Sequence, residues 1–305
     1  MNIKNLTIAT FLTISTSYFS FAQEESTTAE KTKAENQKHI AIVAGTPHYS
    51  PAASMPMLKQ ELEKFGFKVT LISPEWNTEK DPRGVPGLEI LADADVTIFF
   101  IRWLQLKDEQ LKHITDYVEA GKPVVGLRTT GHGFNYPKED PRSKLNVGFG
   151  KDVLGSPYLI HLAGSTQLKV NEDQKDNPIL TGISGSWKSP GTLYLTKLEE
   201  GVTPLITGTG KAKRTGTVTN MFGTHELQPI MSDTVAWTWT NKHGGKAFYT
   251  SLGHTGDFAQ PNSMRLMING IHWAADAPIP SADTEISTYI VKSLKKKKRK
   301  KQESE

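Results

Sequence analysis

A turn at the end of an apolar segment holds the residues best suited to chemistry. The segment 124–127 is apolar and β-prone, and it stops at Arg128, Thr129, Thr130 and His132. Ligands of open α/β sheets bind at the carboxyl ends of strands, and a sharp strand-to-helix turn there carries the nucleophile of many hydrolases. No serine stands at this turn, and the chain has no cysteine. The sequence therefore predicts a site without the usual nucleophile.

Polar and aromatic residues also follow three other apolar segments. Because the strands of a parallel sheet end at one edge, we expect all of these residues to line a single cleft. The predicted substrate-binding residues are Arg128, Thr129, Thr130, His48, Tyr49, Arg102 and Trp103, and the predicted catalytic residues are His254, Asp257 and His132.

Each residue type suggests a role. A histidine oriented by a carboxylate is a common general base near neutral pH, so we expect Asp257 to orient His254. Thr129 and Thr130 are expected to donate hydrogen bonds to a ligand oxygen, since threonine without an N-terminal amine is a rare nucleophile. Arg128 stays protonated and offers a fork of donors to a carboxylate or to sugar hydroxyls.

Structural roles are alternatives for several of these residues. His48 could cap the next helix, Arg102 could serve an ion pair, and Trp103 could pack in the interior. Either a core or a carbohydrate site would suit the aromatic residues Trp187, Tyr194, Trp237 and Trp239.

Cofactors stay unassigned. Imidazoles from three loops, those of His48, His132 and His254, would suit zinc or another divalent ion, but no HExxH spacing accompanies them. No GxGxxG pattern follows a predicted strand, so the sequence gives no support to a nucleotide cofactor.

Alternating strands and helices are predicted to position these residues. Strands are expected at 39–45, 68–72, 96–101, 124–127 and 245–253, and helices at 52–65, 88–91, 106–120 and 262–275. This alternation predicts a parallel sheet covered on both faces. From 135 to 245 the chain is rich in Gly, Pro, Ser and Thr. It predicts an irregular β and loop insertion, with short strands at 166–170, 202–207 and 235–239.

The two ends differ from the domain predicted at 39–278. Residues 1–22 have Lys4 as their only charge, an apolar stretch and a small-x-small end, which indicate a secretory signal peptide. Residues 23–38 are polar and predict a disordered linker. The tail 279–305 is expected to be mostly disordered, and seven consecutive basic residues fill 295–301.

Charge and cysteine content narrow the cellular setting. The net charge of +4 comes from the basic run, which could touch anionic surfaces. The lack of cysteine excludes disulfides and a lipoprotein anchor. No segment is long enough to span a membrane comfortably. We therefore expect a soluble periplasmic or secreted protein that binds a small molecule and no specific nucleic acid. Its oligomeric state stays open.

Three segments, 124–134, 176–183 and 245–273, resemble the trehalose-utilisation (ThuA-like) family in the same order. The resemblance covers nearly all of 39–277. It implies a flavodoxin-like, doubly wound, mostly parallel sheet related to class I glutamine amidotransferases. It also implies a part in carbohydrate use, including the processing of keto-sugars.

The resemblance also shows what is missing. In the amidotransferases a Gly-x-Cys-x-Gly turn holds the nucleophile, and Arg128 stands in its place here. Glutamine hydrolysis by that mechanism is therefore excluded. His254 matches the amidotransferase histidine, whereas Gly256 occupies its acidic partner's position and Asp257 follows one step later.

Together these features predict an exported carbohydrate-utilisation protein that acts on a sugar or keto-glycoside without a covalent nucleophile. A noncatalytic sugar-binding or sensing module is one alternative, and a metal-dependent hydrolase is another. The sequence leaves open whether the protein is an enzyme.

Overall fold

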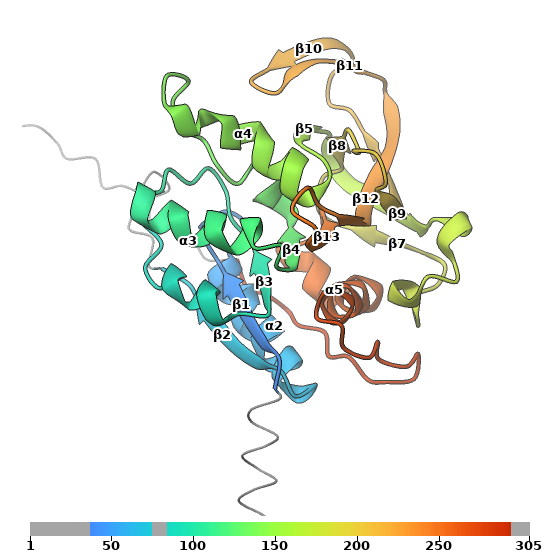
Figure 1. Ribbon diagram of the computed structural model, residues 1–305. Helices are drawn as coiled ribbons and strands as arrows, with labels where there is room; N and C mark the ends of the chain where they lie inside the picture. The colour runs from blue at the N-terminus through green and yellow to red at the C-terminus, as the bar shows by residue number, and fades with distance from the viewer. Residues whose placement is uncertain (1–36, 75–83, 294–305) are drawn as a thin grey trace, which may run out of the picture. The chain divides into compact units, whose positions relative to one another are not determined.

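A computed structural model describes residues 37–74 and 84–293 (Figure 1). From Lys38 onward these residues belong to one compact unit. The predicted signal peptide, nearly all of the predicted linker and the basic run lie outside the described residues. No helix in the described ranges has both the length and the apolar character needed to cross a bilayer.

One half of the central sheet is parallel and follows the order β2-β1-β3-β4-β13. Strands β1, β3 and β4 are buried along their whole length, as expected when helices cover both faces. The expected doubly wound α/β fold is confirmed. The strands are β1 (His39–Val43), β2 (Lys68–Ile72), β3 (Val96–Phe99), β4 (Val124–Leu127) and β13 (Lys246–Thr250).

Two apolar cores lie on opposite faces of this sheet because alternate side chains of each strand point to opposite sides. Ile40 and Ile42 join the core formed with helices α2 (Pro51–Lys64) and α5 (Pro261–Ala274). Ala41 joins the other core, formed with η1 (Leu88–Asp93) and α3 (Asp108–Glu119).

The region expected to be irregular carries more strands than its sequence suggested. Four of them continue the sheet in antiparallel pairing, in the order β13-β12-β9-β6-β7. Two further pairs, β5 with β8 and β10 with β11, stand apart as small antiparallel sheets (Figure 1). The strands are β5 (Tyr158–His161), β6 (Ala163–Val170), β7 (Ser186–Ser189), β8 (Tyr194–Thr196), β9 (Thr203–Lys211), β10 (Gly216–Asn220), β11 (Gly223–Leu227) and β12 (Ile230–Thr240).

Short helical turns connect these strands. One of them, η2, follows β4 directly, and another, η7, lies just beyond the end of β13. They are η2 (Arg128–His132), η3 (Pro141–Lys144), α4 (Leu145–Gly148), η4 (Phe149–Val153), η5 (Glu172–Gln174), η6 (Pro178–Leu180) and η7 (Thr255–Ala259).

The start of the expected disordered tail is instead packed against the domain, which corrects the boundary at 279. The backbone N–H of Tyr289 donates to Phe258 O at 2.7 Å, and its hydroxyl donates to Glu61 of α2 at 2.6 Å. The backbone N–H of Ser287 also donates to Glu61, at 2.9 Å. Val291 joins the core on the α2 face. Sparse apolar residues and one buried carboxylate are enough to hold this segment.

Candidate functional site

The turn after β4 has the strained backbone of a nucleophile elbow. Arg128, at its tip, has φ 45°, in the left-handed region that non-glycine residues seldom adopt. Five described non-glycine residues have positive φ. Four of them lie in the segments that follow β1, β3 and β4, namely Arg128, Tyr49, Ser50 and Trp103. Such strain costs about 1–3 kcal/mol per residue and tends to gather at functional sites. It therefore marks this sheet edge as the candidate site.

The guanidinium of Arg128 is buried under two tyrosine rings, with 1% of the residue exposed. Its Cζ lies 4.1 Å from the ring centroid of Tyr49 and 4.9 Å from that of Tyr194. Nη1 donates to Ser251 O at 2.7 Å, and Nη2 donates to the Tyr49 hydroxyl at 3.1 Å and to Thr192 Oγ1 at 3.4 Å. The fork of donors expected to hold a ligand is thus occupied by the protein.

Two features of Arg128 nevertheless point to a ligand. Its Nε is buried without a hydrogen-bond partner among the described residues. Within ranges 37–74 and 84–293, no carboxylate forms an ion pair with it within 4.0 Å. A buried cation is costly unless an opposite charge or several hydrogen bonds compensate it. Arg128 therefore supplies fixed positive charge beneath the site.

Asp257 orients His254 through the main chain and not through the ring. Its Oδ2 accepts the backbone N–H groups of Gly253 and His254, each at 2.9 Å, and its Oδ1 accepts the Ser189 hydroxyl at 2.6 Å. The carboxylate is fully buried and saturated by these donors. The predicted carboxylate–imidazole pair is therefore replaced by a capped turn at the start of η7.

The ring of His254 is fixed as one tautomer by that turn. Its Nδ1 accepts the backbone N–H of Gly256 at 3.1 Å, so Nε2 carries the proton. Burial, followed by the charge of Arg128, lowers the pKa of His254, while Asp257 opposes this shift. The neutral ring consequently presents an N–H donor, a role that suits hydrogen bonding to a ligand oxygen.

His132 lies in an aromatic cluster built from several elements. Its ring centroid is 4.2 Å from that of Tyr158, 5.8 Å from Tyr194, 6.3 Å from Phe222 and 6.5 Å from Trp103. Burial, followed by the charges of Arg102 and Arg128, lowers the pKa of His132 well below its usual value. Its Nδ1 is buried and has no partner in the described part of the chain. His132 is therefore a neutral imidazole with one ring nitrogen to offer.

The other predicted residues divide between the site and its scaffold. Arg102 stacks on Trp103 with Cζ 3.4 Å from the ring centroid, and the His48 and Tyr49 rings meet at 4.6 Å. Thr129 is buried with an unpartnered hydroxyl, judged against the described residues. Thr130 Oγ1 lies 2.6 Å from Phe99 O and 2.8 Å from Leu127 O, so its hydroxyl serves the turn and is not available to a ligand.

Four cluster residues come from the insertion and were not predicted as site residues. Tyr158 and His161 belong to β5, and the tyrosine hydroxyl lies 2.6 Å from Nδ1 of the histidine. Tyr194 begins β8, and Phe222 is at the tip of the β10–β11 hairpin. The signal available in the sequence was the aromatic content of this region. Trp187, Trp237 and Trp239, by contrast, donate to Ser263 Oγ, Leu154 O and Glu200 O.

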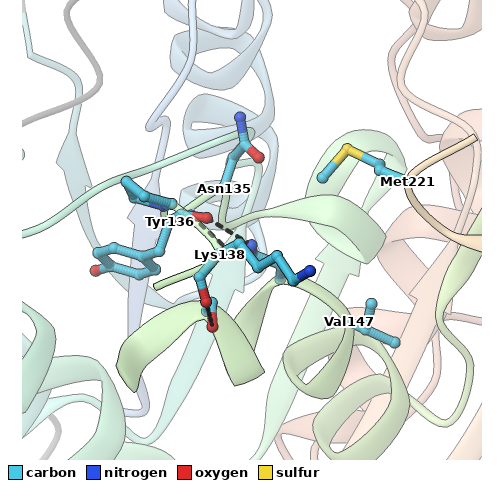
Figure 2. Close-up of a pocket in the computed structure, with 8 residues that line it drawn as sticks. Asn135, Tyr136, Lys138, Val147 and Met221 are labelled. Atoms are coloured by element: carbon cyan, nitrogen blue, oxygen red, sulfur yellow. Dashed lines mark hydrogen bonds between the residues drawn. The ribbon is translucent and has the colours of Figure 1, made fainter. Parts of the chain in front are cut away.

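An open pocket of about 580 Å³ is lined by residues that lie close in sequence to this cluster. Met221 and Val147, both exposed apolar side chains, are at the pocket in Figure 2, together with Asn135 and Lys138. Met221 directly precedes Phe222 of the cluster, and Asn135 is three residues beyond His132. The pocket is thus lined by residues that are close in sequence to two members of the cluster.

The described residues hold no group of three or more His, Cys, Asp or Glu side chains arranged to bind a metal. The zinc alternative, based on His48, His132 and His254, thus gains no support from these side chains. The rings of His132 and His161 are instead surrounded by tyrosines.

The fold and this turn define a flavodoxin-like α/β protein whose elbow carries an arginine. The chain belongs to the ThuA family, because the family's sequence model, described as trehalose utilisation, matches residues 39–274. This membership associates the protein with carbohydrate use in general.

Two solved structures match this chain at low sequence identity. A crystal structure of a ThuA-like protein from Parabacteroides merdae matches with a TM-score of 0.55 and 16% identity, over 82% of this chain and 96% of that chain. The mmIFT52 N-terminal domain matches with a TM-score of 0.47 and 10% identity, over 80% and 100% of the two chains. No curated protein matches the sequence.

Proposed function

We propose that this is an exported carbohydrate-utilisation protein that binds a sugar or keto-glycoside at the Arg128–His132–His254 cluster and acts on it without a covalent nucleophile. One observation carries the proposal. Aromatic rings and unpartnered polar atoms occur together at the strained carboxyl edge of the sheet. Ring faces suit the C–H faces of a sugar, and the polar atoms suit its oxygens.

The two central histidines suit different roles. His254 Nε2 is a donor suited to a ligand carbonyl oxygen, where it would stabilise developing negative charge. The lowered pKa of His132 keeps its ring neutral at pH 7, and a neutral imidazole would accept a proton from the carbon beside a keto group. Asp257 is a positioning residue for this chemistry.

A noncatalytic sugar-binding or sensing module is the second candidate. The saturated carboxylate of Asp257 favours it, because the site then lacks a free carboxylate among the described residues to act as a strong general base.

Incubation with mono- and disaccharides and with their 3-keto forms, followed by NMR, tests both candidates. Turnover that falls at least 100-fold in His132→Gln and in His254→Ala supports the enzyme. Binding by calorimetry with no product supports the module. A protein that neither binds nor converts any of these sugars would overturn the proposed function.

A further inference from the structure

Two of the polar atoms that the cluster leaves unused, on Arg128 and His254, are donors. Arg128 Nε–H can only donate, and the proton of His254 is on Nε2 because Nδ1 already accepts Gly256 N–H. The Tyr158 hydroxyl and Nδ1 of His161 lie 2.6 Å apart and bond each other, with either atom able to donate. A ligand group that matches these atoms must be rich in acceptors.

The charges lead to the same conclusion. Arg128 is a buried cation whose hydrogen-bond partners, Ser251 O, Tyr49 OH and Thr192 Oγ1, are all uncharged. Asp257 acts on Arg128 only at longer range, and its oxygens already accept three hydrogen bonds. The positive charge beneath the site is thus left without a contacting carboxylate among the described residues.

A neutral sugar fits this arrangement less well. Each of its hydroxyls carries a proton that needs an acceptor, whereas a carboxylate or phosphate is acceptor-only at its oxygens. Charge-assisted hydrogen bonds to such a group are also stronger than neutral ones.

We propose that the cluster selects a sugar that carries an anionic group, and that this group accepts a hydrogen bond from His254 Nε2 under the attraction of the buried Arg128 charge. The inference rests on the proposed function, since it specifies the class of sugar. The anionic group can be a carboxylate or a phosphate, and the ligands of the test distinguish these two sources.

Calorimetry with matched ligands tests the preference. The probes are glucose, glucuronate, glucose 6-phosphate and the non-sugar carboxylate benzoate. We expect one of the anionic sugars to bind at least 10-fold more tightly than glucose, and this advantage to shrink as NaCl is raised from 20 to 500 mM. In Arg128→Met the advantage should fall at least 5-fold. Arg214→Met, which removes an exposed arginine in the β9–β10 loop, should retain it.

The outcomes separate the two proposals. Equal or tighter binding of glucose overturns the anionic preference and leaves the proposed function standing. Benzoate binding as tightly as glucuronate overturns the sugar specificity, and binding of no sugar overturns the proposed function itself. If Arg128→Met does not fold, His254→Ala decides, because an advantage that is unchanged in this variant contradicts the inference.

Discussion

The carboxylate of Asp257 binds the backbone N–H of His254 at 2.9 Å, while the imidazole of His254 is held by the N–H of Gly256. An acidic residue three positions after the histidine therefore builds the turn that presents the ring. This arrangement makes His254 a donor, and it makes Asp257 a determinant of the stability of the turn.

Asp257→Asn should lower the free energy of unfolding by about 2 kcal/mol, since hydrogen bonds to a buried charged group are worth about 1.5–3 kcal/mol each and one amide cannot replace both oxygens. Urea denaturation measures the change. Ser189→Ala, which removes only the hydroxyl that donates to Oδ1, should cost about 1 kcal/mol. Equal stability of wild-type protein and Asp257→Asn would contradict the capping role.

The strained backbone at Arg128 can be tested apart from its side chain. Arg128→Gly and Arg128→Ala remove the same guanidinium, but alanine must still adopt φ 45°. We expect the glycine variant to be more stable by about 1 kcal/mol, because the left-handed region costs an L-residue roughly 1–2 kcal/mol. Thermal unfolding of the two variants under one condition gives the difference. A more stable alanine variant would show that the turn relaxes.

Gly270 allows α5 to pack closely on β13. A Cβ at this position would lie 2.3 Å from the Phe248 ring, so Gly270→Ala should destabilise the protein by about 2 kcal/mol through overpacking, despite the higher helix propensity of alanine. Gly148→Ala is the matched control. Its helical φ is −61°, and the nearest atom would be 3.7 Å away, so we expect no loss of stability. Chemical denaturation of both variants would reveal the contrast.

Glu61 connects helix α2 to residues 287–289. Burial alone would raise the pKa of this carboxyl, but hydrogen bonds from Lys64, Tyr289 and Ser287 outweigh burial and lower it. A lowered folded-state pKa gives stability that is present above the ordinary pKa of 4.5 and is lost as the pH falls through the folded-state value. Glu61→Gln should therefore cost about 1–3 kcal/mol at pH 7 and less in acid.

Denaturation of wild-type protein and Glu61→Gln at pH 7 and pH 3 measures this difference. Lys112→Met is the control, and it should change stability little because the side chains of Lys112 and its partner Asp116 are 70% and 54% exposed. A difference between wild-type protein and Glu61→Gln that does not depend on pH would refute the ionised role of Glu61.

Buried histidines should make the protein sensitive to acid. Burial is the main cause that lowers the pKa of His132, His254 and His272 below the ordinary 6.5. Between the folded-state pKa and 6.5 the unfolded chain binds more protons, so stability must fall as the pH drops through this window. Urea denaturation at pH 7.5, 6.5 and 5.5 should show this loss, with a smaller slope in His132→Gln. A flat profile would contradict neutral burial of these rings.

Short-range pattern was enough to predict the scaffold and the strained turn at which the candidate site lies. Apolar runs and glycine caps are local signals, and they placed β4, helix α5 and the Arg128 turn. The insertion was harder to read, because a strand such as β10 has one buried position and resembles loop sequence.

Long-range packing set the roles of the individual side chains. The guanidinium of Arg128 donates to partners that are 79, 64 and 123 positions away in the chain. These hydrogen bonds occupy the donors that the sequence led us to expect for a ligand. Spacing cannot reveal whether Asp257 binds a ring or a backbone N–H, nor that Tyr158 and Phe222 approach His132. Hydrogen-bond geometry and burial arise only when distant segments pack together, and they determine which atoms are left for a ligand.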